Sequence, residues 1–172
     1  MKNYFFTLAI TFLTLFSCND DTTTTYYLIR HAEKDRTDKT NKNPNLNEQG
    51  LDRAKKWANY FKDIHLDAIY STNYNRTQQT AQPTAANKKL IVKSYQPNNM
   101  YNDDFKKETL GKSVLIVGHS NTTPAFVNTI YKKNNSVKDT KLYKSMDDKD
   151  NASLYIVTII GKSISSKVIA VN

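Results

Sequence analysis

Short apolar runs rich in β-forming residues recur along the chain and are separated by polar or amphipathic segments. The runs expected to form strands lie at residues 26–29, 66–70, 90–92, 114–117, 154–160 and 164–171. The run at 114–117 is wholly apolar, as in a strand buried on both faces. Gly161-Lys162-Ser163 predicts a hairpin between the last two strands.

Helical patterns fill the segments between these runs. Helices are expected at 51–61, at 75–86, from 103 or 104 to about 110, and from 123 to 130. Asn47 is the candidate N-cap of the first helix, and Pro83 is expected to end or kink the second. Asp103 or Asp104 is expected to cap the third, and Thr123-Pro124 resembles a cap followed by an N1 proline.

Strands that alternate with helices predict an α/β fold. We expect a three-layer sandwich with a mostly parallel central sheet, helices on both faces and an antiparallel C-terminal hairpin. A length of 172 residues suits one such domain. The long polar segment at 34–47, which contains Pro44, is expected to be a loop.

The N-terminal segment has the pattern of a secretory signal. Lys2 precedes an apolar stretch at 4–16, and a small residue, Ser17, stands directly before Cys18. This looks like a bacterial lipoprotein signal, in which residues 1–17 are removed and Cys18 is acylated. Polar residues 18–25 then form a tether, and 26–172 form the domain. The alternative is a buried N-terminal helix with a chance cysteine.

Charge and cysteine content narrow the function classes. The formal net charge is +9, carried mostly by scattered lysines that form no long basic run, which favours anionic ligands over specific nucleic-acid binding. Cys18 is the one cysteine, so no internal disulfide can form. The three histidines have no spacing typical of metal ligands, and we expect no metal and no cofactor.

Arginine and histidine residues, whose side chains can bind anions, stand shortly after the apolar runs that are expected to form strands. Arg30-His31 follows the first strand, Gly118-His119-Ser120 follows the fourth, and Arg76 falls in the first turn of the helix after the second. Ligands of open α/β sheets bind beyond the carboxyl ends of strands. The sequence therefore predicts one crevice with two histidines and two arginines, and guanidinium groups bind phosphate bidentately.

Four ordered motifs resemble those of the histidine phosphatase superfamily, the phosphoglycerate-mutase-like enzymes. Residues 27–33 (YLIRHAE) are similar to its Arg-His-Gly-Glu motif, with Ala32 in place of the usual glycine. Residues 45–54, 70–81 and 117–122 resemble its Leu-Thr-x-x-Gly, Ser-x-x-x-Arg and second-histidine segments. Only 42 residues separate Arg76 from His119, which leaves little room for a cap insertion and indicates the small, single-domain branch, similar to phosphohistidine phosphatases.

The resemblance implies a metal-independent phosphatase acting on phosphate monoesters or phosphohistidine. Neutral His31 would attack phosphorus and become a phosphohistidine that water hydrolyses, while Arg30, Arg76 and a protonated His119 bind the phosphoryl group. Its partners would be a phosphorylated small molecule or phosphoprotein and, through Cys18, a membrane. We expect a lipid-anchored protein of the bacterial cell envelope that faces away from the cytoplasm.

Alternatives remain open at this point. One is a mutase of the phosphoglycerate type, and another is a phosphate-binding lipoprotein without turnover. Asp103 or Asp104 could donate a proton to the leaving group, although helix capping explains both. Glu33 is expected to orient the first loop, and His65 is expected to lie on the surface.

Overall fold

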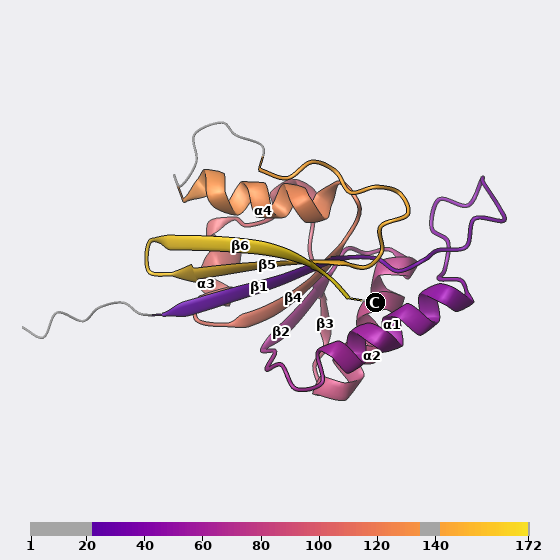
Figure 1. Cartoon of the computed structure of the whole chain (residues 1–172), viewed down its shortest axis with the longest axis horizontal. Helices are drawn as coiled ribbons and strands as arrows, with labels where there is room; N and C mark the ends of the chain where they lie inside the picture. Colours follow the sequence, from indigo (N-terminus) through magenta and orange to yellow (C-terminus); the bar gives the residue numbers. More distant parts are fainter. Residues whose placement is uncertain (1–21, 135–141, 172) are drawn as a thin grey trace, which may run out of the picture.

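A computed structural model describes residues 22–134 and 142–171 as one mixed sheet between two layers of helices (Figure 1). Along the chain the elements are β1 (Thr23–Arg30), α1 (Glu48–Tyr60), β2 (Ala68–Ser71), α2 (Asn75–Lys88), β3 (Val92–Ser94), the short helix η1 (Pro97–Asn99), α3 (Asp103–Thr109), β4 (Ser113–Gly118), α4 (Thr122–Lys133), β5 (Ser153–Ile160) and β6 (Ser163–Ala170). The sheet has six strands in the order β3-β2-β4-β1-β5-β6.

Strand pairing confirms the predicted fold class. β1, β2, β3 and β4 pair in parallel, whereas β5 pairs antiparallel with β1 and with β6. Gly161, with a positive φ of 55°, lies in the tight turn between β5 and β6 as the sequence indicated. The strand β4, which contains the wholly apolar run 114–117, lies inside the sheet between β2 and β1.

Alternating residues of the inner strands fill two separate cores. In β1, Leu28 packs into the cluster under α3 and α4, and Ile29 packs into the cluster under α1 and α2. In β4, Ile116 and Leu115 divide in the same way. Figure 1 shows α4 on one side of the sheet and α1 and α2 on the other. Burial on both faces explains why these strands read as continuous apolar runs.

The first strand begins earlier than expected. β1 starts at Thr23, so residues 23–25, assigned to the tether, are part of the sheet. Thr24 is buried and its Oγ1 accepts a hydrogen bond from the Gly111 N–H at 2.9 Å. The polarity of the threonines predicts a linker, but β-branched residues favour strands, and the Thr24 hydroxyl has a hydrogen-bond partner in the folded chain. Residues 1–21, which include the signal segment, Cys18 and most of the predicted tether, lie outside the described residues.

Helix boundaries needed several corrections. Pro83 does not end α2, which continues to Lys88, because Ala81 and Ala85 on either side of it are buried in the core under α1 and α2. Asn102, not Asp103 or Asp104, caps α3 by accepting from the Phe105 N–H. Thr123 does not cap the fourth helix: the N-cap is Asn121, and α4 begins at Thr122, two residues before the expected first helical residue, Pro124.

Other boundaries agree with the sequence pattern or shift by a few residues. Asn47 caps α1 as expected, because its Oδ1 accepts from the Gly50 N–H at 2.9 Å. The third strand begins at Val92, two residues later than predicted. Within the described residues, no helix has the length and apolar character needed to cross a membrane.

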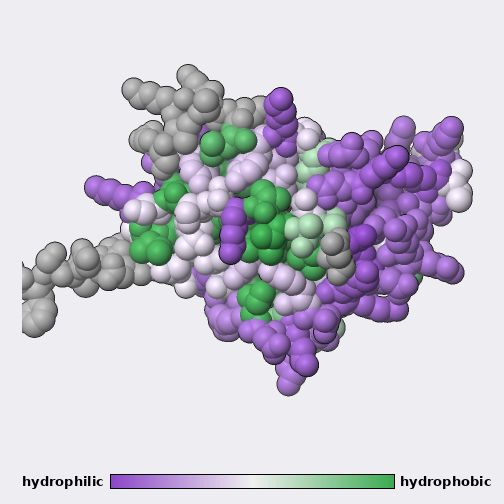
Figure 2. All heavy atoms as spheres, in the orientation of Figure 1, coloured by the Kyte–Doolittle hydropathy of each residue, from purple (hydrophilic) through white to green (hydrophobic). Residues whose placement is uncertain are grey.

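Polar side chains gather at one end of the molecule. Figure 2 shows hydrophilic residues massed over the end where β1 leads into the 34–47 loop and α1 begins. We call the ends of β1, β2 and β4 at Arg30, Ser71 and Gly118 the carboxyl edge of the sheet, and their starts the amino edge. The candidate site lies at the carboxyl edge.

Candidate active site

The four predicted residues line one cavity at the carboxyl edge. Arg30, His31, Arg76 and His119 face a hollow of about 580 Å³. The ring centroids of His31 and His119 lie 5.5 Å apart. The strand register explains this proximity, because β1 and β4 are neighbours that pair in parallel up to Arg30 and Gly118. Segments almost 90 residues apart in the chain therefore deliver their polar residues to one place.

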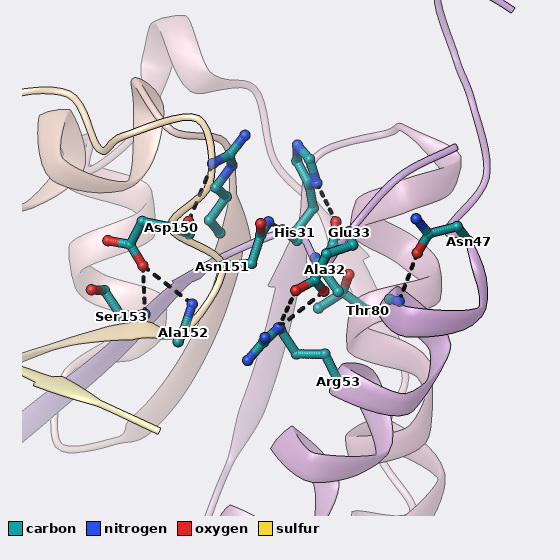
Figure 3. Close-up of polar contacts among 12 residues, drawn as sticks. His31, Ala32, Glu33, Asn47, Arg53, Thr80, Asp150, Asn151, Ala152 and Ser153 are labelled. Carbon is teal, nitrogen blue, oxygen red and sulfur yellow. Dashed lines mark hydrogen bonds and ion pairs between the residues drawn. The ribbon is translucent and has the colours of Figure 1, made fainter. Parts of the chain in front are cut away.

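His31 is held with one ring nitrogen available for attack. Its Nδ1 lies 2.7 Å from the Ala32 carbonyl oxygen, which can only accept, so Nδ1 carries the hydrogen and Nε2 keeps its lone pair. Asn151 donates to the His31 carbonyl at 2.7 Å, and Figure 3 shows Asn151 beside His31. Burial lowers the pKa of His31 to about 3, with smaller contributions from Arg30, His119 and Arg76. The free protein therefore keeps this imidazole neutral.

Thr80 of α2 fixes the backbone beside His31. Its Oγ1 accepts from the Ala32 N–H at 2.9 Å and donates to the Arg76 carbonyl at 2.7 Å. Ala32, which replaces the usual glycine of the motif, is fully buried beside Leu46 and Ala54. One hydroxyl thus joins the residue after the histidine to the first turn of α2, which carries the arginine.

His119 is oriented by a chain of hydroxyls. Thr72 donates to Thr77 Oγ1 at 3.0 Å, so Thr72 Oγ1 accepts from His119 Nε2–H at 2.9 Å. Burial and the nearby Arg76, Arg30 and Lys34 lower the pKa of His119 to about 4. In the free protein, burial and these cations therefore favour a neutral His119, whereas the protonated His119 expected from the motifs concerns the state with a bound phosphoryl group.

Arg30 is nearly inaccessible to solvent, and the loop at 147–150, distant in sequence, binds its guanidinium group. It is 3% exposed, and its Nη1 donates to the carbonyls of Asp147 at 2.8 Å and Asp150 at 3.2 Å. Its Nη2 lies 3.5 Å from a carboxylate oxygen of Asp148. The Nε group is buried without a partner. This loop fixes the guanidinium and leaves one N–H group unused.

Arg76 stacks on an aromatic ring at the mouth of the cavity. Its guanidinium carbon lies 4.4 Å from the centroid of the Tyr74 ring, which also meets the His119 ring edge-to-face at 5.1 Å. Its Nε and Nη1 are buried without partners. Buried guanidinium nitrogens without partners are unfavourable unless an anion completes them. Together with Arg30 Nε, the two arginines that line the cavity keep three such nitrogen atoms.

Glu33 orients the first loop, as the sequence suggested. It accepts two hydrogen bonds from Arg53 Nε, at 2.7 and 3.0 Å, and Figure 3 shows this pair next to Ala32. Gly50 of α1 packs directly on the backbone of Glu33, because a Cβ at Gly50 would lie 2.0 Å from the Glu33 carbonyl oxygen. The second motif therefore serves to seat α1 against the loop that follows His31.

The other candidates of the sequence analysis lie elsewhere. Asp103 is 97% exposed and pairs with Lys106, and neither it nor Asp104 lines the cavity. His65 is on the surface as predicted, 79% exposed and 2.9 Å from a carboxylate oxygen of Asp67. Cys18 lies outside the described residues. Over residues 22–134 and 142–171, no group of three or more His, Cys, Asp or Glu is placed to hold a metal ion.

Sequence reasoning missed four residues that shape the site: Thr72, Tyr74, Asp148 and Asn151. Thr72 and Tyr74 stand within the motif around Arg76, where a hydroxyl and an aromatic ring beside an arginine were available signals. Asp148 and Asn151 had no such signal, because their contacts join residues more than a hundred positions apart.

Comparison with known proteins agrees with this geometry. Residues 26–96, a range that includes His31 and Arg76, match the family model described as histidine phosphatase superfamily (branch 1). The match is therefore to the superfamily that the motifs resemble. The matched segment ends before His119, whose place in the site comes from the coordinates. No match was found among curated proteins.

Solved structures share the fold at low sequence identity. A mycobacterial glucosyl-3-phosphoglycerate phosphatase has a TM-score of 0.61 and 13% identity, covering 87% of this chain and 99% of its own. The putative phosphohistidine phosphatase SixA from Agrobacterium tumefaciens has a TM-score of 0.54 and 21% identity, and the match covers 86% of this chain and 97% of that one. A phosphoglycerate mutase from Bacillus anthracis has a TM-score of 0.59 and 14% identity, and the match covers 88% of this chain and 94% of that one. The chain therefore spans nearly the full extent of these solved structures.

Proposed function

We propose that this protein is a phosphatase that hydrolyses phosphate monoesters or phosphohistidine through a phosphohistidine intermediate on His31. The observation that carries the proposal is that Arg30 and Arg76 line the same cavity as His31 and keep buried guanidinium nitrogens without a hydrogen-bond partner, while His31 keeps a lone pair on Nε2. A phosphoryl group is the anion that matches both features, because it accepts from guanidinium groups and its phosphorus accepts a nucleophile.

The reaction proceeds in two displacements. His31 Nε2 forms a bond to phosphorus as the bond to the leaving atom breaks, which is oxygen in an ester and nitrogen in phosphohistidine, and the electron pair departs with that atom. Water then attacks the phosphohistidine on His31 and gives up a proton to solvent, the P–N bond breaks, and Nε2 regains its lone pair. Arg30 and Arg76 neutralise the charge on the equatorial oxygens in both steps. The bound dianion raises the pKa of His119, so that this ring takes up a proton when substrate arrives and donates to the phosphoryl group.

A mutase or a binding protein without turnover are the competing functions. The phosphoglycerate mutase among the structural neighbours shares only the fold at 14% identity. A neutral, oriented His31 with a free Nε2 supports turnover over binding alone, because a purely binding site gains nothing from an uncharged imidazole beside a dianion. Product analysis with a phosphoglycerate separates transfer from hydrolysis.

We also propose that Cys18 carries a lipid anchor that places the domain in the bacterial cell envelope, facing away from the cytoplasm. The support is the sequence pattern of residues 1–18. β1 begins at Thr23, so only a few residues separate Cys18 from the folded domain. Metabolic labelling with a radioactive fatty acid tests this, because the label should enter the full-length protein and be lost in Cys18→Ser.

Hydrolysis of an aryl phosphate tests the catalytic proposal, because a phenolate leaves without a proton donor. Wild-type protein should release phosphate, and His31→Asn should reduce kcat by at least about 1,000-fold, the scale of removing a nucleophile. His65→Asn, on the surface, is the matched control and should retain the wild-type rate. Full activity of His31→Asn would reject the proposal.

A further inference from the structure

A second cavity adjoins the one that holds the arginines. Its volume is about 800 Å³, within the range of small-molecule sites, and it lies between the 34–47 loop, the start of α1 and the loop at 148–151. The two cavities share His31, Lys34, Arg36 and Asp148. A leaving group departing from a phosphoryl group on His31 has this second cavity beside it.

The acidic residues of the second cavity already have partners. Glu33 is bound by Arg53 at 2.7 Å, and Asp35 accepts from the backbone and hydroxyl of Thr37, both at 2.8 Å. Asp148 faces Arg30 Nη2 at 3.5 Å. The basic residues at the junction differ, because Lys34 and Arg36 form no ion pair with any acidic residue in the described part of the chain.

The surroundings of Lys34 are dominated by positive charge. Burial lowers the pKa of Lys34, and Arg76, Arg36 and Arg30 lower it further, while Asp148 opposes them with the smallest contribution. The backbone of Lys34 is fixed by a bridge to Leu46, so this ammonium group is carried on an anchored segment. A phosphoryl dianion can bind to Arg30 and Arg76, and the positive charges of Lys34 and Arg36 then remain without a partner anion.

We propose that Lys34 and Arg36 form a second anion-binding position, and that preferred substrates are small phosphate esters whose leaving group carries another anionic group. The proposal rests on the proposed phosphatase function, since it places the first phosphoryl group at Arg30 and Arg76. The leaving group would occupy the second cavity, with its carboxylate or second phosphoryl group bound by the ammonium and the guanidinium at the junction.

Two aryl phosphates of matched shape test this directly: 4-carboxyphenyl phosphate and its neutral amide, 4-carbamoylphenyl phosphate. Wild-type kcat/KM should favour the carboxylate by about 10- to 100-fold, the scale of one or two charge-assisted contacts. 1,4-Phenylene bisphosphate, assayed in parallel, distinguishes a preference for phosphoryl from one for carboxylate. The double variant Lys34→Gln, Arg36→Gln should lose most of the preference for the carboxylate. Of the single variants, Lys34→Arg should keep part of the preference that Lys34→Gln loses.

Lys42→Gln is the matched control. Lys42 is exposed, belongs to the same loop and lines neither cavity, so its removal deletes the same unit of charge without touching the junction. It should keep the wild-type preference. Thermal unfolding of each variant identifies any that fail to fold, and the single variants then carry the comparison.

The outcomes separate this proposal from the function it rests on. Equal kcat/KM for the carboxylate and the amide in wild-type protein, or a preference that survives in the double variant, would overturn the second anion position while leaving the phosphatase intact. Without turnover of any ester, the proposed function fails. Calorimetric binding of the same two esters then decides the second position: tighter binding of the carboxylate that the double variant loses supports it, and equal binding refutes it.

Discussion

The amino and carboxyl edges of the same parallel strands differ in whether their buried polar groups have hydrogen-bond partners. At the amino edge, the Gly111 N–H donates to Thr24, the Ser113 N–H donates to Asp67 at 2.8 Å, and the Tyr26 hydroxyl lies 2.6 Å from Thr109. At the carboxyl edge, Arg30 and Arg76 keep buried N–H groups without partners. One edge is completed by the chain itself, and the other is left for a ligand.

This difference indicates where stability and function are divided. A satisfied hydrogen bond at the amino edge contributes to folding, whereas an unpartnered buried guanidinium costs free energy until an anion arrives. The carboxyl edge therefore stores binding capacity at the expense of the free protein's stability. Predictions about each edge should accordingly differ in what they change: ligand binding and rate at one, folding at the other.

Removing a guanidinium from the carboxyl edge should have the largest effect. Arg76→Ala should lower kcat/KM for an aryl phosphate by about 100- to 1,000-fold, the loss seen when a transition-state donor is deleted. Arg76→Lys should recover only part of this, because an ammonium is a point charge without the bidentate geometry. Steady-state kinetics measure both. An alanine variant as active as wild type would show that the unpartnered N–H groups bind nothing in the reaction.

Acid should destabilise the carboxyl edge through its two histidines. Their pKa values in the folded protein, about 3 for His31 and about 4 for His119, lie below the ordinary value near 6.5. The unfolded state therefore binds more protons between about pH 6.5 and 4, so the free energy of unfolding should fall as pH drops, by about 1 kcal/mol per pH unit for each histidine.

Urea unfolding of wild type and His31→Asn from pH 7 to pH 5 measures this dependence. The variant lacks one of the two titrating rings and should show a shallower decline. Saturating inorganic phosphate should also flatten the decline, because the anion favours protonated His119. Identical slopes with and without His31 would mean that this ring is not held neutral.

The amino edge can be weakened without touching the reaction. Thr24→Val keeps the shape of a buried, 3% exposed side chain but removes the oxygen that accepts from the Gly111 N–H. We expect a loss of about 1 kcal/mol in the free energy of unfolding and unchanged kcat/KM. Chemical unfolding and a phosphatase assay on the same preparation test this. A changed kcat/KM with an unchanged free energy of unfolding would contradict the assignment of the amino edge to stability.

The smallest effect concerns the internal anion of the site. Asp148 lies 3.5 Å from Arg30 and is 81% exposed, so its carboxylate competes with an incoming phosphoryl group. Asp148→Asn should tighten competitive inhibition by inorganic phosphate about three- to tenfold. Asp52→Asn removes the same charge from a surface pair with Lys55 and should leave the inhibition constant unchanged. Weaker inhibition in Asp148→Asn would instead make Asp148 a positioning residue for Arg30.

The sequence predicted the sheet and the place of the site because both follow from local pattern. Apolar runs marked the parallel strands, and arginine with histidine at their ends marked the carboxyl edge. That Pro83 would end α2 was wrong, because helix propensity takes no account of Ala85 packing in the core beyond it. Thr24 was misjudged because a polar residue gives no sign that its hydroxyl will find a buried partner.

Long-range contacts made through backbone carbonyls could not be predicted. Arg30 is bound by the carbonyls of Asp147 and Asp150, and a carbonyl oxygen is present at every residue, so nothing in the sequence distinguishes those two. The lowered pKa of His119 in the free protein could not be predicted for a related reason. It depends on burial and on the positions of Arg76 and Arg30 around the ring, which only the folded chain determines.

Trapping the covalent intermediate tests the central claim most directly. Wild-type protein is mixed briefly with a ³²P-labelled aryl phosphate, quenched in base and digested, and the labelled peptide is identified by mass spectrometry. The account predicts a base-stable, acid-labile phosphoryl group on His31 that is absent from His31→Asn. Phosphate release at the wild-type rate without label on His31, or with label on another residue, would contradict it.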